Sequence, residues 1–437
     1  MQVATTRIKT NSQHHLTIGG VDALQLADTY QTPLVVYDVD AIREQIHQFQ
    51  QAFAEQHVNY VISYASKALA ITAIYQVLAQ EQVHVDVVSG GELYTAMQAH
   101  FPMKWVSFHG NNKSMAELEM ALQQHVGVII VDNFYELQLL QKLASKYPQP
   151  TAVMLRINPG ITAHTHEYDQ TGQEDSKFGF DWSSGQATRA AEAVLQTQSL
   201  KLVGIHAHIG SQILETQGFK LLAQKLGAVM KTWEQELHYR ADILNFGGGF
   251  GIQYTKSDQV IAPRQFVQTL VQTLRDTLNT SDLPMPTIWI EPGRALVGPA
   301  GYNLYTIGAR KDIPGYLPYV SVDGGMGDNL RPALYQAQYE AVLARAPQAP
   351  IQEKVRLSGR YCESGDILIS QLDLPATKPG DVLAMLDTGA YGYSMASNYN
   401  RVPRPAVVFA EQGRAQEVVR RESFADLTHL DQSYNLN

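Results

Sequence analysis

The sequence predicts an α/β chain with a (β/α)8 barrel, of the TIM-barrel type, followed by an all-β C-terminal domain. Three observations predict this fold class. Short runs rich in β-branched residues recur eight times between residues 60 and 291. Each run is followed by a longer stretch with helical periodicity, which is typical of alternating strands and helices. After Pro299 the helical periodicity mostly ends, and Gly and Pro separate short strand-like runs instead.

The eight runs are nearly continuous in apolar residues, which is typical of parallel strands whose sheet is covered on both faces. The expected strands are residues 60–66, 83–89, 105–109, 126–132, 152–158, 202–209, 243–246 and 287–291. The expected helices between them include residues 69–79, 91–100, 114–123, 133–145, 186–195, 216–237 and 264–278. Eight such units over roughly 230 residues match a barrel of about 250 residues. A doubly wound open sheet is the alternative, but it needs fewer strands and usually a phosphate loop after the first one.

The C-terminal part of the chain is expected to form strands at residues 302–309, 319–322, 354–357, 381–387 and 406–410. Their short length and the turn residues between them indicate an all-β domain. The first 34 residues do not follow the barrel pattern and could pack with this β domain. We therefore expect a barrel over residues 36–299 and a second domain made of residues 1–35 and 300–437.

The composition excludes several classes of protein. The chain of 437 residues has 33 Lys and Arg against 42 Asp and Glu, a formal net charge of −9. This balance argues against sequence-independent nucleic-acid binding, which depends on neutralising phosphates. No apolar run approaches the roughly 20 residues of a membrane span. The single cysteine, Cys362, excludes an intrachain disulfide and fits a reducing compartment. We expect a soluble, cytoplasmic protein without a membrane or nucleic-acid partner.

Polar and titratable residues follow the expected barrel strands, where the reacting groups of such barrels lie. They are Lys67 after the first strand, Asp86 in the second, His109 at the end of the third, Asn158 in the fifth, His206 and His208 in the sixth, Gly247, Gly248 and Gly249 after the seventh, and Glu291, Gly293 and Arg294 at the eighth. Groups of this kind converging on one rim indicate an active site.

Each of these features also has a plainer interpretation. Lys67 could be a solvated surface residue, or a lysine that loses its charge by desolvation and forms a Schiff base. The glycine run 247–249 could be a flexible turn or a backbone cradle for a phosphate, and its spacing excludes a dinucleotide fingerprint. Glu291 and Arg294 could form a local ion pair, or bind a ring nitrogen and an anion. His206 and His208 could be core histidines or metal ligands, but no further ligand is clustered beside them in the sequence, so we expect no metal.

Four residues outside the barrel are further candidates. Cys362 could be a small buried apolar residue, but its neighbours in YCESGD suggest an exposed turn and a chemical role. Arg331 and Tyr335, in RPALY, could simply pack at the surface, and Tyr391, in DTGAYG, could be a core tyrosine.

Ten motifs together resemble the fold-type III pyridoxal-phosphate-dependent decarboxylases. They are YASKAL, DVVSGGEL, FHGNNKS, THEY…TGQEDSKFGF, GIHAHIGSQI, GGGFG, EPGR, RPALY, CESGD and DTGAYG, in the family's order and spanning about residues 33–406. Any one of them is weak, but ten in order are highly specific. The similarity is greatest to the members that act on meso-2,6-diaminopimelate. It implies a barrel followed by a β domain that the N-terminal segment joins.

The resemblance implies pyridoxal 5'-phosphate as cofactor and gives the barrel residues their roles. Lys67 would hold the cofactor covalently, Asp86 would lie near Lys67, His208 would stack on the cofactor ring, and Glu291 would keep the ring nitrogen protonated. The cofactor phosphate would be held by Ser211, Gly248, Gly249, Gly293, Arg294 and Tyr391.

The resemblance also implies the reaction, the decarboxylation of meso-2,6-diaminopimelate to L-lysine and CO2 at the last step of lysine biosynthesis. Arg294, Arg331 and Tyr335 would hold the distal carboxylate, since Arg suits bidentate contact. Tyr391 would also line the substrate site, and Glu363 would hold the distal ammonium. Cys362 would protonate the carbanion after CO2 leaves. Cys362 and Glu363 would reach into the partner's site, so a homodimer with shared active sites is implied.

Two departures from the family pattern and three alternatives remain. Gly359-Arg360-Tyr361 stands where the family usually has Gly-Pro-Leu, and Gly327 stands where it usually has Asn. The first alternative is a decarboxylase of another basic amino acid, such as ornithine, arginine, D-lysine or D-ornithine. The second is a non-catalytic homologue that binds pyridoxal phosphate. The third is a metal-dependent barrel hydrolase.

Overall fold

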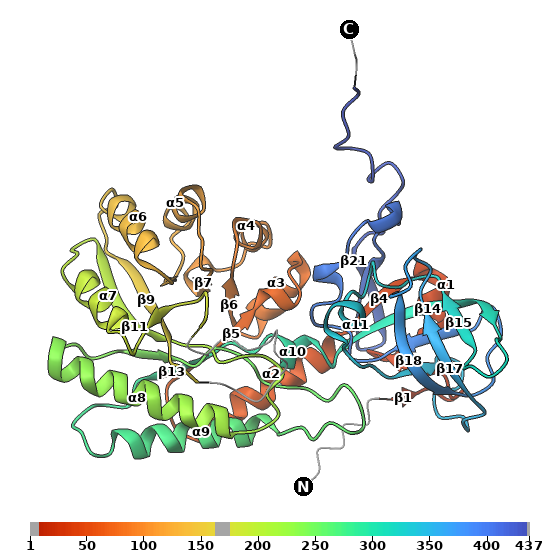
Figure 1. Ribbon diagram of the computed structural model, residues 1–437, viewed down its shortest axis with the longest axis horizontal. Coiled ribbons are helices and arrows are strands. Elements are labelled where there is room, and N and C mark those ends of the chain that lie inside the picture. The colour runs from red at the N-terminus through yellow and green to blue at the C-terminus, as the bar shows by residue number, and fades with distance from the viewer. Residues whose placement is uncertain (1–7, 162–174, 435–437) are drawn as a thin grey trace. The chain divides into compact units, whose positions relative to one another are not determined.

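The computed structural model describes residues 8–161 and 175–434 and divides the chain into two compact units (Figure 1). Unit 2 comprises Gln45–Ile252 and Gln259–Leu296, and unit 1 comprises Met1–Glu44, Gln253–Asp258 and Val297–Asn437. Each unit is described by itself below. The domain boundaries drawn from the sequence stay a prediction.

Unit 2 is a closed barrel of eight parallel strands. They are β5 (Tyr60–Ala65), β6 (His84–Val87), β7 (Val106–Phe108), β8 (Val128–Val131), β9 (Thr151–Asn158), β11 (Leu200–His206), β12 (Ile243–Asn245) and β13 (Thr287–Ile290). Each strand pairs with the next, and β13 pairs with β5 and closes the ring. The short β10 (Phe180–Asp181) pairs with β9 outside the ring. The fold class predicted from the sequence is confirmed.

Helices follow the barrel strands and surround the ring in Figure 1. They are α3 (Thr72–Gln80), α4 (Gly90–Gln98), α5 (Met115–Gln123), α6 (Phe134–Ala144), α7 (Gln186–Leu195), α8 (Gln217–Leu237) and α9 (Pro263–Leu278), with α2 (Val39–Ala54) before β5 and α10 (Arg294–Val297) after β13. Side chains cap their first turns: Ser89, Ser114 and Asn133 accept from backbone N–H groups of α4, α5 and α6. These caps fix where each helix leaves the barrel rim.

The barrel strands differ from the predicted ranges by up to three residues at their ends, and one of these differences bears on the site. The expected sixth strand included His208 and ended at Ile209, whereas β11 ends at His206. The neighbouring strand β12 ends at Asn245, and the glycine run begins there with Gly247 at φ 66°. Residues beyond Ala207 therefore have no regular ladder partner on that side. His206 is therefore in the strand, whereas His208 lies in the loop after it.

Unit 1 is dominated by a mixed sheet in the order β18-β17-β15-β14-β4-β20-β21. The strands are β4 (Leu34–Asp38), β14 (Gly301–Lys311), β15 (Tyr319–Val322), β17 (Glu353–Ser358), β18 (Ile367–Leu374), β20 (Ala406–Glu411) and β21 (Arg414–Val419), while β16 (Ala341–Leu343) and β19 (Val382–Met385) pair with each other and β19 also pairs with β14. The N-terminal strand β4 is central, antiparallel to β14 and parallel to β20.

The N-terminal segment shares one apolar core with the C-terminal strands. Leu16, Ile18 and Leu26 are buried in the same cluster as Leu304 and Val408. The segment forms β1 (Lys9–Thr10), β2 (Leu16–Ile18), β3 (Val21–Asp22) and α1 (Ala23–Tyr30). The described part of the unit also contains three short helical segments, α11 (Arg331–Tyr335), η4 (Tyr393–Met395) and η5 (Tyr399–Arg401). Among the residues described, no helix is long and apolar enough to cross a membrane.

Candidate active site

Four titratable side chains meet at the carboxyl ends of the barrel strands. Glu291 follows β13, and its Oε1 atom lies 3.1 Å from Nε2 of His109, while its Oε2 atom lies 3.4 Å from Nε2 of His206. Nε2 of His109 is 3.6 Å from Oδ1 of Asp86. Asn245 donates a hydrogen bond of 2.6 Å to Oε1 of Glu291. Because all these residues are buried, their charges interact strongly.

The cluster keeps Glu291 ionised. Burial alone would raise the pKa of Glu291, but the positive charge of His109, the nearby His206 and the contact of 3.1 Å from His109 outweigh it and hold that pKa well below its usual range. The pKa of His109 is raised, since the attraction of Asp86 and Glu291 exceeds the effect of burial. Burial lowers the pKa of His206 to about 4, so its ring is neutral. Burial raises the pKa of Asp86 to about 7, although His109 opposes the shift.

Lys67 lies in a tight turn near this cluster, in η1 (Ser66–Ala68) directly after β5. Its side chain is exposed, whereas both neighbours are buried. Oγ of Ser66 donates a hydrogen bond of 2.5 Å to Glu92, which also accepts from the N–H of Val88, so the turn is tied to the end of β6. The charge of Lys67 lowers the pKa of Asp86 and of His208. An exposed amine at the mouth of a buried acidic cluster is available to react with a ligand.

The glycine run after β12 packs directly against backbone atoms. A Cβ atom at Gly248 would lie 2.3 Å from the carbonyl oxygen of Glu291, and one at Gly249, where φ is 105°, would lie 2.5 Å from that of Gly210. Only glycine fits there. The N–H of Gly248 donates to Nδ1 of His208 at 3.2 Å. Burial and the charge of Lys67 lower the pKa of His208 well below its usual value. The ring is therefore neutral, with its proton on Nε2.

Arg294 and Ser211 form a polar corner beside the glycine run. Nη2 of Arg294, which begins α10, donates a hydrogen bond of 2.7 Å to Oγ of Ser211. Gly293 packs closely on β5, since a Cβ there would lie 3.0 Å from atoms of Ala65. A buried guanidinium, a hydroxyl and backbone N–H groups together suit an anion such as phosphate.

The other predicted residues lie in unit 1. Arg331 is buried at the start of α11, and its Nη1 atom donates to the hydroxyls of Tyr254 at 2.8 Å and Tyr339 at 2.6 Å. Its guanidinium also lies 6.0 Å from the ring centre of Tyr335. Tyr391 is half-buried with a left-handed φ of 60°. An aromatic surround of this kind holds the guanidinium in one place.

Cys362 and Glu363 are adjacent and exposed in the loop between β17 and β18. The N–H of Cys362 donates to Oδ1 of Asn400 at 3.3 Å, and the hydroxyl of Tyr399 donates to Oε1 of Glu363. The structure thus brings the barrel candidates together in unit 2 and Cys362 beside Glu363 in unit 1. Motif residues 162–174 lie outside the described residues.

Several residues of the site were not assigned roles from the sequence. His109 and His206 are recognisable as polar strand ends, but only the fold brings them to Glu291. One ligand atom each of His109, His206 and Glu291 lies within 4.8 Å of the others, so His206 has neighbouring ligand groups in space although none stands beside it in the sequence. Here the carboxylate is already paired with the charged His109. Asn245, Tyr254 and Tyr339 do not stand in any motif that the sequence analysis singled out, so the sequence alone did not identify them as site residues.

Comparisons with known proteins identify the family. Residues 39–298 match the family described as pyridoxal-dependent decarboxylase, pyridoxal binding domain. A diaminopimelate decarboxylase of Bacillus subtilis (strain 168) is 52% identical over 421 residues, which cover 96% of this chain and 96% of that protein. This chain belongs to the diaminopimelate decarboxylase family. The predicted enzyme class, a pyridoxal-dependent carboxy-lyase, is confirmed.

Solved structures of diaminopimelate decarboxylases agree with this family and with the fold. One from M. jannaschii has a TM-score of 0.92 and 33% identity and covers 98% of both chains. One from Helicobacter pylori, complexed with L-lysine, has a TM-score of 0.85 and 31% identity and covers 93% of this chain and 98% of that one. A lysine/ornithine decarboxylase from Vibrio vulnificus, at 21% identity and a TM-score of 0.75, shares the fold alone.

The barrel residues fit the pyridoxal phosphate that the diaminopimelate decarboxylase family uses. Glu291 is an ionised carboxylate at the bottom of the site, which suits a protonated ring nitrogen. Oδ1 of Asp86 is buried without a hydrogen-bond partner among the described residues, so a polar ligand atom has a place there. The corner of Arg294, Ser211 and the glycine run suits the phosphate. The predicted cofactor is confirmed by the family, while the residue roles stay predictions.

Proposed function

We propose that this chain decarboxylates meso-2,6-diaminopimelate to L-lysine and CO2, with the chemistry centred between Lys67 and Glu291 in the barrel. The observation that carries the proposal is the ionised Glu291, buried against His109 beneath an exposed Lys67. Membership of the diaminopimelate decarboxylase family supports the choice of substrate.

The barrel residues would hold and tune the cofactor. Pyridoxal phosphate, when bound, supplies an electron sink for the bond to the leaving carboxylate. Lys67 would hold it covalently until the substrate amine replaces the lysine. Glu291, paired with His109, would keep a proton on the ring nitrogen, because a buried anion stabilises the positive charge there. The neutral His208 would lie on one ring face, held by the N–H of Gly248.

The phosphate would lie at the polar corner. Arg294 and Ser211 are already hydrogen-bonded, so the guanidinium and the hydroxyl are fixed before the ligand arrives. Backbone N–H groups of the Gly248–Gly249 and Gly293 turns would supply the remaining donors, together with the hydroxyl of Tyr391. A site built in this way needs no net positive charge on the protein.

Unit 1 would supply substrate recognition. Arg331, held by Tyr254 and Tyr339, would bind the distal carboxylate together with Arg294 and Tyr335, and Tyr391 would line the same site. Glu363 would bind the distal ammonium. Cys362 would give a proton to the carbon that loses CO2, which an exposed thiol on a fixed loop can do.

We further propose that the enzyme is a cytoplasmic homodimer with shared sites. Cys362 and Glu363 are exposed within the chain, so both are accessible to a second copy. In that arrangement each loop would complete the site of the partner subunit. The single cysteine is consistent with a reducing cytoplasm.

A substrate panel tests the proposed function. The purified protein with pyridoxal phosphate should release CO2 from meso-diaminopimelate with a kcat/KM well above that for ornithine or D-lysine, which lack a distal carboxylate. Equal turnover of all three would contradict the substrate assignment. Absence of turnover with the cofactor bound would favour a non-catalytic homologue. Loss of activity on adding chelator, but not on removing the cofactor, would favour a metal-dependent hydrolase.

A further inference from the structure

Gly327 and Tyr361, two residues that depart from the family pattern, lie against each other. A Cβ atom at Gly327 would lie 2.0 Å from the hydroxyl oxygen of Tyr361 and 2.3 Å from its Cζ atom. Gly327 does not have a left-handed φ, so its backbone would accept other residues. The glycine is therefore required for space, and the space is filled by the ring of Tyr361.

The ring of Tyr361 has little freedom to move aside. It is 8% exposed, and a Cβ at Gly325 would lie 2.9 Å from its Cδ2 atom. The N–H of Tyr361 donates to one carboxylate oxygen of Asp366 at 2.8 Å, and the N–H of Met326 donates to the other oxygen at 2.8 Å. Asp366 thus ties the loop of Tyr361 to the loop of Gly327. A larger residue at position 327 would have to displace the ring.

The outer face of the Tyr361 ring supports the residues next to it in the sequence. It stacks on the ring of Tyr399, with centroids 6.1 Å apart and an interplanar angle of 19°. The hydroxyl of Tyr399 donates to Glu363, and the neighbouring Asn400 accepts from the N–H of Cys362. The position of the Tyr361 ring therefore bears on the orientation of both Cys362 and Glu363.

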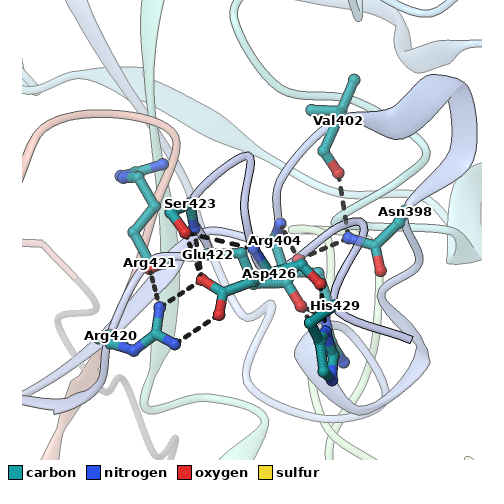
Figure 2. Close-up of polar contacts among 9 residues, drawn as sticks. All are labelled: Asn398, Val402, Arg404, Arg420, Arg421, Glu422, Ser423, Asp426 and His429. Atoms are coloured by element: carbon teal, nitrogen blue, oxygen red, sulfur yellow. Dashed lines mark hydrogen bonds and ion pairs between the residues drawn. The ribbon is translucent and has the colours of Figure 1, made fainter. Parts of the chain in front are cut away.

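The segment that carries Tyr399 is fixed at its other end (Figure 2). Nδ2 of Asn398 donates to the carbonyl oxygen of Val402 and to Oε2 of Glu422. Glu422 accepts in turn from the backbone and the guanidinium of Arg404. Because this end is held, a shift of Tyr361 acts on Tyr399 and Glu363 instead of moving the whole segment.

We propose that Gly327 and Tyr361 are a matched pair of positioning residues that orients the proton donor Cys362 and the ammonium-binding Glu363. The inference rests on the proposed function, since it takes the roles of Cys362 and Glu363 from it. The missing side chain of Gly327 leaves space that the ring of Tyr361 fills. Tyr399 stacks on that ring and donates to Glu363, so the position of the ring affects the position of Glu363. Neither residue of the pair touches the reacting atoms.

A double-mutant cycle tests the pairing. The variants are Gly327→Asn, Tyr361→Leu and the double variant, which restores the residues usual in the family. Gly327→Asn adds atoms where the ring lies, and Tyr361→Leu removes the ring that would clash with them. Gly308→Asn is the matched control, because Gly308 is exposed in β14 and a Cβ there has no neighbour closer than 3.8 Å. Kinetics are measured with meso-diaminopimelate and saturating cofactor.

Gly327→Asn should lower kcat/KM strongly, through a lower kcat and a higher KM, and Tyr361→Leu should lower it less. The double variant should recover part of the lost kcat/KM. Its kcat/KM should be about tenfold higher than the value obtained by multiplying the two single effects, a coupling typical of contacting residues. The absorbance of bound cofactor should not change, because it depends on the barrel. If Gly327→Asn does not fold, recovery of folded enzyme in the double variant supports the contact between the two residues, and a lower kcat and higher KM in folded Tyr361→Leu then support the positioning role.

If the effects of the two substitutions on kcat/KM simply multiply in the double variant, the two residues are not coupled and the proposed pairing is wrong. Recovery of stability in the double variant without recovery of kcat and KM would mean that the pair only packs the core. Tyr399→Phe adds a second readout, since loss of its hydroxyl should raise KM with little change in kcat. An unchanged KM would contradict the path through Glu363. Failure of the wild-type enzyme to turn over the substrate would instead contradict the proposed function.

Discussion

The barrel rim and the loop between β17 and β18 hold reactive groups in opposite ways. At the rim, Glu291, His109 and Asp86 are buried, and their charges fix one another. In the loop, Cys362 and Glu363 are exposed, and the carboxylate of Asp366 accepts a hydrogen bond from the backbone N–H of the preceding Tyr361. A group that must keep one charge state is buried in a charged cluster. A group that must reach a substrate is left open and oriented by its backbone.

The largest effect is expected at the rim, from Lys67→Ala. The variant should lose nearly all turnover and the absorbance of covalently held cofactor, because Lys67 is the amine that would hold the cofactor. Spectroscopy of the purified variant and a CO2-release assay measure both. Lys201→Ala, an exposed lysine on β11, is the control and should behave as the wild type. Undiminished turnover in Lys67→Ala would show that the barrel rim does not hold the cofactor through Lys67, and would contradict the contrast drawn between the rim and the loop.

A smaller effect is expected in the loop, from Cys362→Ala. The variant should keep the bound cofactor, because the barrel is untouched. The rate should fall by the roughly 10²–10⁴-fold that is typical of losing an acid–base group. Steady-state kinetics and the cofactor absorbance separate the two effects. A mixed dimer of Lys67→Ala and Cys362→Ala chains should regain activity if sites are shared, and absence of any recovery would argue for self-contained sites.

A third prediction concerns stability at the barrel rim. Nζ of Lys113 is buried and donates to Glu136 at 2.8 Å and to the carbonyl oxygens of Gly110 and Ile130. Lys113→Met should lower the free energy of unfolding by about 3–5 kcal/mol, because it leaves the carboxylate of Glu136 buried without a counter-charge. Denaturant unfolding measures the loss. Lys113→Met combined with Glu136→Leu should lose less, and an equal or larger loss in the double variant would refute the charge argument.

The smallest effect is expected at the other end of the barrel, where His84 stacks on Trp105 with ring centroids 5.6 Å apart. Burial lowers the pKa of His84 from 6.5 to about 4. Between these values the unfolded chain binds more protons than the folded chain. The contribution of His84 to stability is therefore present above pH 6.5 and lost as the pH falls through 4, by at most about 1.36 kcal/mol per pH unit.

His84→Phe should remove this part of the pH dependence. Thermal or denaturant unfolding of wild type and variant between pH 4 and 7 measures the difference, with exposed His57→Asn as control. Parallel pH curves for wild type and His84→Phe would show that the pKa of His84 is the same in the folded and the unfolded chain, which would contradict the lowered pKa.

The sequence was most informative where structure is local. The apolar runs of the barrel placed all eight strands, since strands buried on both faces are continuous in apolar residues. In unit 1, β1 to β4, β16, β18 and β21 were not among the predicted strands. The middle of β18, at Ser370 and Gln371, is exposed, and β21 contains no buried residue, so the apolar pattern is interrupted in β18 and weak in β21.

For the site, too, the sequence predicts local features but not contacts between distant residues. Lys67, His208 and Glu291 could be named because each stands in a motif at the end of a predicted strand. The pairing of His109 with Glu291 and of Gly327 with Tyr361 could not be predicted, because these partners are far apart in the sequence. Only the closed ring of the barrel and the loops of unit 1 bring them into contact.

The most direct test of the account is borohydride reduction of the enzyme with pyridoxal phosphate bound, followed by peptide mapping. Reduction fixes the cofactor on the amine that holds it. The account predicts a single modified peptide, with the reduced cofactor on Lys67. Modification of another lysine in an active enzyme, or none at all, would contradict the claim that Lys67 holds the cofactor above Glu291.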